Sequence, residues 1–393
     1  MARQQNDSTA LEQVLAILAD HGLEDLGRAV EVLLNEAMRI ERQRFLGANP
    51  YERSAERRGH ANGFKPKRLK SRVGELQLEI PQVRNLEEGA EPFYPSALER
   101  GQRSERALHV ALAEMYVQGV STRKVARITE ELCGFEVTSS QVSRAAAQLD
   151  EALVAWRERP LGRTPYLILD ARYEKVRHGG QVISCAVLVA LGVTEDGRRR
   201  VLGVSVSLSE AELHWRRLLA SLKERGLCGV QLIISDDHAG LRAAREAEFT
   251  AVPWQRCQFH LQRNAVALIP KTSMRREVAR VLRSVFQADS RAEADERLRQ
   301  AVARFQDSAP RLAEWIEQAI PEGLTILDFP EQHRRRLRTT NAAERIHQEI
   351  RRRTRVAGLF PHDDSLLRLV SAVPIEFDEE WATGKRYLTM ETD

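Results

Sequence analysis

The chain has 393 residues, of which 42% are hydrophobic and 30% are charged, and its formal net charge at pH 7 is +4. This composition excludes a disordered chain and predicts roughly two or three globular domains. The sequence contains no apolar run of the roughly 18 residues that a membrane-spanning helix needs, and no signal peptide opens it. Four cysteines do not suffice for a disulfide framework in a chain of this length, so we expect a cytoplasmic protein without a membrane partner.

The basic residues are concentrated in two blocks. Residues 53–72 and 334–355 are rich in Arg and Lys, whereas residues 87–91 and the tail from Glu376 are acidic. Local basic blocks in a nearly neutral chain indicate phosphate contacts at defined places. Solvated helix faces explain either block alone about equally well.

Residues 1–50 predict an N-terminal helical segment. Leu11, Val14 and Leu18 recur at helical spacing, and the pattern repeats from Val30. A pair of interaction or dimer helices is the plainest explanation of this pattern.

Residues 51–103 predict a basic hairpin and linker region. A basic loop with several glycines precedes two alternating stretches, 67–73 and 75–80, which predict a hairpin that Pro81 closes. A basic hairpin with few apolar residues can lie along a DNA backbone. The candidate DNA contacts of this region are Arg57, Arg58, Lys67 and Arg68.

Residues 104–160 predict three helical stretches that include a helix-turn-helix-like DNA-binding domain. Ser121 begins the second stretch and Gly134 ends it, and Thr138 or Ser139 begins the third. A short helix, a glycine turn and a Ser/Thr-capped helix form the helix-turn-helix pattern, although many helical bundles share it. The candidate DNA contacts here are Arg123, Lys124 and Arg144.

Residues 161–260 predict an α/β domain built around a carboxylate. The strand that begins at Tyr166 ends at Asp170, two further strands follow, a fourth strand ends at Asp236, and a last short strand covers 250–254. The predicted order β-β-β-α-β-α-β is that of a ribonuclease-H-like fold. In such a sheet the first and fourth strands lie side by side, so we expect Asp170 and Asp236 to lie close together.

The remainder of the chain predicts an all-helical insertion at 261–330, a return to the α/β domain at 331–375 and a polar tail at 376–393. Asn341 is a good N-cap for a helix that carries Glu344. Gly358 and Pro361 are predicted to end that helix. The whole chain is therefore expected to be a multidomain protein of the α+β or α/β class.

Three acids are candidates for one cation site: Asp170, Asp236 and Glu344. A charge on a central strand is costly unless it is neutralised, and a divalent cation shared with other carboxylates neutralises it. Phosphoryl transfer on DNA commonly uses two divalent metals, and Mg²⁺ binds carboxylates together with substrate phosphates and water. We therefore expect Mg²⁺, with Mn²⁺ as the alternative. The arginines predicted to hold the DNA backbone beside Glu344 are Arg345, Arg351 and Arg352, and His347 of the same helix is a further candidate DNA contact.

Each acid also has a plain structural explanation. Glu344 can complete a capping box with Asn341, and Asp236 with Ser235 can cap the helix after the strand. Asp170 is hardest to explain in this way, because it follows three apolar residues.

With these motifs in hand, the chain closely resembles the Mutator-type transposases of bacterial insertion sequences, a DDE group. The resemblance runs from about residue 50 to residue 385, with the motifs in the family's order. The matching stretches are Arg57-Arg58-Gly59, Asn62-Gly63, residues 115–124, Asp170-Ala171, residues 175–177, residues 202–204, residues 223–227, Ser235-Asp236, Gly240-Leu241, residues 254–257, His260, Thr340-Asn341 and Glu344-Arg345.

The resemblance implies a ribonuclease-H-like domain interrupted by a helical insertion, with Asp170, Asp236 and Glu344 as the metal-binding triad. It implies hydrolysis that frees a 3′-hydroxyl at the element's end, then attack of that hydroxyl on target DNA. It also implies binding to terminal inverted repeats, a homodimer or larger assembly, and nucleoid association. A catalytically silent DNA-binding regulator and a general ribonuclease-H-like nuclease remain as rival functions.

Cys257 and His260 form the family's Cys-x-x-His motif. Two ligands are too few for a structural zinc site unless others join them, and the other cysteines have no obvious spacing for this. We expect a packing or hydrogen-bonding role near the catalytic Asp, with substrate contact by His260 as the alternative.

Overall fold

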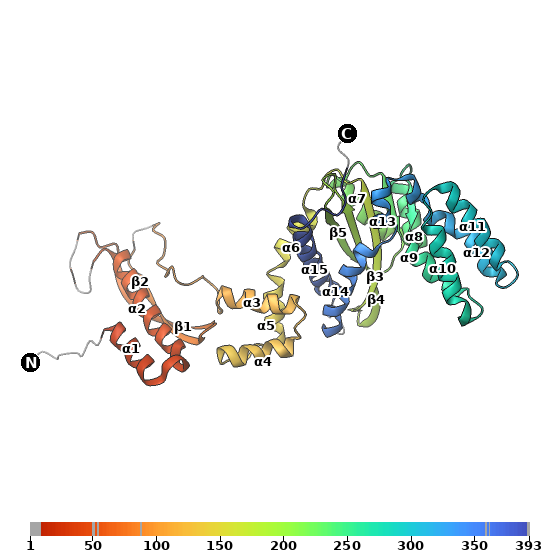
Figure 1. Ribbon diagram of the computed structural model, residues 1–393. Helices are drawn as coiled ribbons and strands as arrows, with labels where there is room; N and C mark the ends of the chain where they lie inside the picture. The colour runs from red at the N-terminus through yellow and green to blue at the C-terminus, as the bar shows by residue number, and fades with distance from the viewer. Residues whose placement is uncertain are drawn as a thin grey trace, which may run out of the picture. The chain divides into compact units, whose positions relative to one another are not determined.

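The computed structural model describes residues 9–48, 52, 55–86, 89–357, 360 and 362–390 (Figure 1). The chain divides into two compact units, Met1–Gln148 and Leu149–Asp393. The helix α6 (Asp150–Glu158), which the sequence grouped with the preceding helices in 104–160, therefore belongs to the second unit. Gly358 and Pro361 lie outside the described residues. Within these residues, no helix has both the length and the apolar character required to cross a membrane.

The first unit begins with α1 (Ala10–His21), a 3-10 turn η1 (Gly22–Asp25) and α2 (Leu26–Leu46), so the predicted helical segment is confirmed. A hairpin follows, formed by β1 (His60–Ser71) and β2 (Gly74–Arg84). Met38 of α2 packs with the apolar face of β2 in one core.

The hairpin is longer than the sequence indicates. The predicted loop forms the start of β1, with a bulge between Ala61 and Phe64, and Pro81 pairs with Phe64 instead of closing the hairpin. Both strands of a two-stranded sheet have a free edge, so a proline that lacks an N–H group can be placed there without loss of a ladder hydrogen bond.

Three short helices complete this unit: α3 (Arg106–Val117), α4 (Thr122–Cys133) and α5 (Ser139–Ala147). The Ser121 side chain accepts a hydrogen bond from the Lys124 N–H group, and Thr138 forms a capping box with Gln141. Gly134 ends α4 with a φ of 69°, a left-handed conformation that glycine adopts without strain. The predicted helices and their caps are confirmed.

The second unit contains a five-stranded sheet in the order β5-β4-β3-β6-β7. Its strands are β3 (Tyr166–His178), β4 (Gln181–Val193), β5 (Arg199–Ser207), β6 (Leu232–Ser235) and β7 (Trp254–Arg256). The first three form an antiparallel meander, and β6 pairs with β3 in parallel. The predicted adjacency of the first and fourth strands is therefore confirmed.

Two strand boundaries differ from the prediction. β3 continues past Asp170 to His178, because β4 supplies pairing partners along this whole length. β7 begins at Trp254, where a strand over 250–254 is expected, because its pairing with β6 starts at Ile233 and Trp254.

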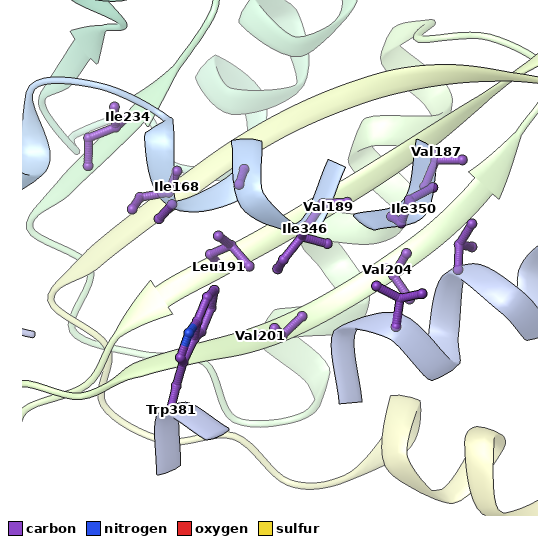
Figure 2. Close-up of a cluster of buried hydrophobic side chains, with 14 of the residues drawn as sticks. Ile168, Val187, Val189, Leu191, Val201, Val204, Ile234, Ile346, Ile350 and Trp381 are labelled. Atoms are coloured by element: carbon purple, nitrogen blue, oxygen red, sulfur yellow. The ribbon is translucent and has the colours of Figure 1, made fainter. Parts of the chain in front are cut away.

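The two faces of the sheet bury different layers of helices. Leu167 and Leu169 of β3 pack with α7 (Glu212–Glu224) and α8 (Ala239–Glu248). Ile168 and the β3 residues that alternate with Leu167 and Leu169 face the other side of the sheet. The helices α14 (Asn341–Ala357) and α15 (Asp363–Thr383) cover the core on that side. Figure 2 shows Ile346, Ile350 and Trp381 of these helices beside the valines and leucines of the sheet. Full burial of each such aliphatic side chain stabilises the fold by roughly 1.5–3 kcal/mol.

A helical insertion separates β7 from α14 in the sequence. It comprises α9 (Gln258–Ala267), η2 (Thr272–Met274), α10 (Arg275–Phe286), α11 (Arg291–Phe305), α12 (Pro310–Ala319), η3 (Ile320–Gly323) and η4 (Thr325–Asp328). These elements enclose a core of their own, in which Leu282, Phe305 and Ile316 are buried. α13 (Glu331–Leu337) then leads back to the sheet.

The predicted polar tail at 376–393 is wrong for the described part of that segment. α15 continues to Thr383, and Trp381 and Leu388 are buried in the sheet's core. Asp378 is buried as well, and its carboxylate accepts hydrogen bonds from Arg200 at 2.8 and 2.9 Å and from the Val201 N–H group at 2.8 Å. A charged sequence pattern can therefore belong to a packed helix when each buried charge has a partner.

Candidate active site

Asp170 lies on β3, the central strand of the sheet, and its side chain is directed to the face that α14 covers. The residue is only 8% exposed, and its Oδ1 accepts a hydrogen bond from the Ala171 N–H group at 3.0 Å. Burial raises the pKa of Asp170 to about 7, and the negative charges of Asp236, Glu344 and Glu210 act in the same direction. This acid on the central strand is thus buried near three other acids.

Asp236 follows β6 directly and reaches the same place. Because Ile168 of β3 pairs in parallel with Ile234 of β6, the two strands bring their C-terminal acids to neighbouring positions. Asp170 and Asp236 line one pocket of about 230 Å³ together with Glu210, His260 and Arg263, among others. The predicted meeting of the two aspartates is therefore observed.

The neighbouring acid, Asp237, has a different environment. Its carboxylate pairs with Arg242, whose Nε lies 2.9 Å from Oδ1, and with Arg256, whose Nη1 lies 3.1 Å from Oδ2. Asp236 has only the ring of His260 near it among the ion-pair partners that the described residues provide, with Nδ1 3.8 Å from Oδ2. Asp237 is therefore paired with arginines within the fold, whereas the carboxylate of Asp236 is available to another partner.

Glu344 lies in the first turn of α14 and has an exposed side chain. Its negative charge acts on both Asp170 and His260, although it is not one of the residues that line the pocket. In the part of the chain that the structure describes, no three His, Cys, Asp or Glu side chains converge closely enough to enclose a metal ion. The three predicted acids thus share one electrostatic environment, and Asp170 and Asp236 alone share the pocket.

The negative charge of this site and its carboxylate and imidazole groups are suited to binding a divalent cation. Burial raises the pKa of Asp170 most, the like charges around it add to this effect, and a cation among them would offset that repulsion. The ring Nδ1 of His260 is buried at the pocket and has no hydrogen-bond partner among the described residues. Carboxylate oxygens are the ligands that Mg²⁺ prefers, and the pocket leaves room for water and phosphate oxygens.

His347 is a site residue that the sequence does not identify correctly. The sequence suggests it as a DNA contact, but it is only 6% exposed and its Nδ1 lies 3.5 Å from Asp170 Oδ2. Burial, with the charges of Arg172 and His260, lowers the pKa of His347 to about 3, so the imidazole is neutral at physiological pH. Its position three residues after Glu344 places both on one helix face, a spacing that could have indicated it.

Glu210 is also absent from the predicted site. It lies in the segment between β5 and α7, lines the pocket and acts on Asp170. No local sequence signal marks it, because its position depends on how the end of β5 meets the other strands.

Cys257 and His260 lie beside these acids. Cys257 is fully buried, and its Sγ accepts hydrogen bonds from the N–H group and the Oγ1 of Thr340 at 3.3 and 3.5 Å. Cys257 thus forms hydrogen bonds close to Asp236, because its own N–H group donates to the carbonyl of the preceding residue, Ser235, at 2.8 Å.

Comparison with known proteins identifies the family of the chain. The family model described as "Transposase, Mutator family" matches residues 2–384. This chain belongs to the Mutator family of transposases. Both the extent of the match and its continuity confirm the resemblance that the sequence motifs indicated.

Several transposases of insertion sequences are similar to this chain over nearly all of its length. The transposase for insertion sequence element IS406 of Burkholderia multivorans is 58% identical, over 97% of this chain and 98% of that protein. The transposase for ISRM5 of Rhizobium meliloti is 43% identical, over 98% and 94%. The transposase for IS256 in transposon Tn4001 of Staphylococcus aureus is 35% identical, over 95% and 96%.

The candidate DNA contacts in the first unit of this Mutator-family transposase differ in side-chain exposure and in the partners that they already have within the fold. Arg57 donates to the Glu52 carbonyl at 2.7 Å, and Lys67 donates to the Tyr94 hydroxyl at 3.0 Å. The Arg68 side chain is 79% exposed and 3.9 Å from Glu75. The candidates with exposed side chains in this unit are Arg58, Arg68, Arg123, Lys124 and Arg144.

The arginines of α14 also differ from one another. Arg352 donates to Glu349 at 2.8 and 2.7 Å, and the guanidinium of Arg345 lies over the Phe377 ring at 5.6 Å. Arg351 is exposed, and no described residue pairs with its guanidinium. It lines an open groove of about 510 Å³ with Arg352 and Arg355. Of the three predicted contacts on this helix, Arg351 is therefore the one whose positive charge has no partner among the described residues.

Proposed function

We propose that this transposase is a DDE enzyme with a ribonuclease-H-like catalytic domain. It binds the terminal inverted repeats of an insertion sequence, cleaves the element's DNA ends and joins them to target DNA. The observation that carries the proposal is the position of Asp170 and Asp236 at adjacent parallel strands, in one pocket, under the charge of Glu344.

Asp170, Asp236 and Glu344 would hold Mg²⁺, with Mn²⁺ as the alternative ion. When bound, the cation supplies activation of the attacking oxygen and stabilisation of the leaving oxygen. Glu344 is exposed and outside the pocket lining, so it completes the ligand set when the side chain turns toward the two aspartates.

Other residues of the chain position these acids and the DNA. Neutral His347 lies against Asp170 and restricts its carboxylate, while Arg172 donates to the His347 carbonyl at 2.9 Å and holds the helix there. Arg263 lines the pocket and brings a positive charge to the place that a DNA phosphate would occupy. Arg351 and its neighbours on α14 hold the DNA backbone, and the N-terminal unit binds the ends.

The names of the relatives support the choice of substrate. All three are transposases for insertion sequence elements, and each covers nearly the whole of this chain. Joining two ends of one element requires both ends to be held together, so we propose that the protein acts as a dimer or a larger assembly.

A strand-transfer assay with the element's terminal repeats and Mg²⁺ tests the proposal. Asp170→Asn, Asp236→Asn and Glu344→Gln are each expected to lower cleavage at least about 100-fold, because each removes a ligand charge that the transition state needs. Asp237→Asn is the matched control for Asp236. It removes an adjacent carboxylate that arginines already neutralise, so it should retain most of the activity.

Full activity of any one triad variant would remove that residue from the mechanism. Specific end binding without Mg²⁺-dependent cleavage by the unsubstituted protein would favour a silent regulator. Equal cleavage of duplexes that lack the repeats would favour a general nuclease.

A further inference from the structure

The helical insertion separates Asp236 and Glu344 by a long stretch of chain, but one residue connects the two ends of that stretch. The Cys257 N–H group donates to the carbonyl of Ser235, the residue immediately before Asp236, at 2.8 Å. Its Sγ accepts hydrogen bonds from the N–H group of Thr340 at 3.3 Å and from Thr340 Oγ1 at 3.5 Å. Thr340 directly precedes α14, whose first turn carries Glu344.

We propose that Cys257 is a positioning residue that fixes the start of α14, and with it Glu344, relative to Asp236. The proposal rests on the proposed role of Glu344 in holding the cation. It gives the cysteine of the Cys-x-x-His motif a function that needs neither zinc nor contact with DNA.

The burial of both partners makes this contact specific. Cys257 is 0% exposed and Thr340 is 4% exposed, so water cannot replace a lost hydrogen bond at the Thr340 N–H group. Burial raises the pKa of the Cys257 thiol, which therefore stays neutral and acts as a weak acceptor at physiological pH. The Thr340 carbonyl in turn accepts hydrogen bonds from the N–H groups of Ala343 and Glu344 at 2.8 and 3.4 Å, so the position of Thr340 sets the direction of the first turn.

The same short element also presents His260 to the site. Cys257 is the N-cap residue of α9, and His260 lies in the first turn of that helix with its Nδ1 3.8 Å from Asp236 Oδ2. A second connection lies beside the first, because the Gln258 N–H group donates to the Arg338 carbonyl at 3.0 Å. The start of α9 thus contacts the chain on both sides of the insertion.

Two cysteine variants of the full-length protein separate positioning from general packing. Cys257→Ala removes the acceptor, and Cys185→Ala is the matched control, since Cys185 is also 0% exposed and lies on β4 away from the proposed ligands. Cys257→Ser keeps an acceptor at the same place, and Thr340→Val removes only the Oγ1 donor. The measurements are the kcat and KM for end cleavage, the Mg²⁺ concentration for half-maximal rate, and hydrogen exchange of the amides in residues 341–346.

We expect Cys257→Ala to lower kcat about 10- to 100-fold with little change in the KM for DNA, because a small displacement of a catalytic group has effects of this size. The Mg²⁺ requirement should rise, and the amides of residues 341–346 should exchange faster. Cys257→Ser should recover most of the rate, Thr340→Val should fall between the two, and Cys185→Ala should match the unsubstituted protein in all of these readouts.

Equal behaviour of Cys257→Ala and Cys185→Ala in rate, Mg²⁺ requirement and exchange would overturn the proposal. If Cys257→Ala does not fold, Cys257→Ser and Thr340→Val decide the question by the same readouts. Failure of the unsubstituted protein to cleave DNA with Mg²⁺ would refute the proposed function instead, and hydrogen exchange would still decide whether Cys257 fixes the start of α14.

Discussion

At the scale of single residues, the central feature is an aspartate whose ionised form is destabilised by the fold. Asp170 is buried beside three acids, and its pKa is raised to about 7 from the usual value of 3.8. A carboxyl group with a raised pKa favours folding in its protonated form. Its contribution to stability is present below pH 3.8 and is lost as the pH rises to about 7.

Replacement of this acid should therefore stabilise the metal-free protein at high pH. We expect Asp170→Asn to raise the free energy of unfolding by about 1–3 kcal/mol at pH 8 in EDTA, and by less at pH 5, where only part of the stabilising contribution has been lost. Thermal melts at the two pH values measure this, and a larger shift at pH 8 than at pH 5 is the expected result. Mg²⁺ should raise the Tm of the unsubstituted protein and not that of the variant.

The control for this prediction is Asp237→Asn. Its carboxylate is paired with Arg242 and Arg256, so its loss should lower the Tm at both pH values. An equal effect of Asp170→Asn at pH 5 and pH 8 would show that the ionised carboxylate does not destabilise the folded protein at high pH.

The sequence identifies some of these residues and misses others for physical reasons. Asp170 and Asp236 are predictable because each ends a run of apolar strand residues. A charged side chain in such a place is costly unless a partner neutralises it. Glu210 is not predictable, because it follows β5 in a segment without a pattern and reaches the pocket only through the assembled sheet. His347 is misassigned because polar residues on a basic helix look solvated until the packing of that helix is known.

At the scale of secondary-structure elements, α14 combines two roles on opposite faces. Ile346 and Ile350 pack into the core of the sheet, as Figure 2 shows, while Arg351 and Arg352 are exposed. The arginines are not equivalent, because Arg352 forms two hydrogen bonds with Glu349 and this pairing lowers the pKa of Glu349 to about 2. An arginine that is already paired releases fewer counterions when it meets a phosphate.

We accordingly predict that Arg351→Ala weakens DNA binding more than Arg352→Ala does. Arg351→Ala should reduce the slope of log K against log salt by about 1, whereas Arg352→Ala should reduce it by less. Fluorescence anisotropy with the terminal repeat over a range of salt concentrations measures both slopes. A larger change for Arg352→Ala would show that the Glu349 pair opens freely on DNA.

Element types were easier to predict than element ends. The capped helices α4 and α5 and the order of the strands follow from local patterns, because caps and apolar periods act within a few residues. The extension of β3 to His178 does not follow, because residues 171–178 are mostly polar or charged and interrupt the apolar strand pattern. The burial of Trp381 in α15 does not follow either, because the charge partners of Asp378 lie far away in sequence.

At the scale of the whole molecule, the chain consists of two units, each with its own cores. Met38 and Val125 belong to cores of the first unit, and the sheet and the insertion have separate cores in the second. The acids all lie in the second unit, whereas the predicted hairpin and helix-turn-helix contacts lie in the first. This division suggests that recognition of the ends and cleavage can be separated.

Expression of each unit alone tests this division. Residues 149–393 should fold, show a Mg²⁺-dependent rise in Tm and bind DNA without preference for the terminal repeats. Residues 1–148 should bind the repeats specifically and cleave nothing. Specific end binding by residues 149–393 would place recognition in the second unit instead.

The position of the insertion also has a consequence during protein synthesis. Asp170 and Asp236 leave the ribosome before the insertion is made, and Glu344 leaves after it. A nascent chain that stops within the insertion already carries the N-terminal unit but has only two of the three acids. If the protein acts as proposed, aborted synthesis would yield fragments that occupy the element's ends and leave the chromosome uncut, so that breakage would depend on a finished polypeptide.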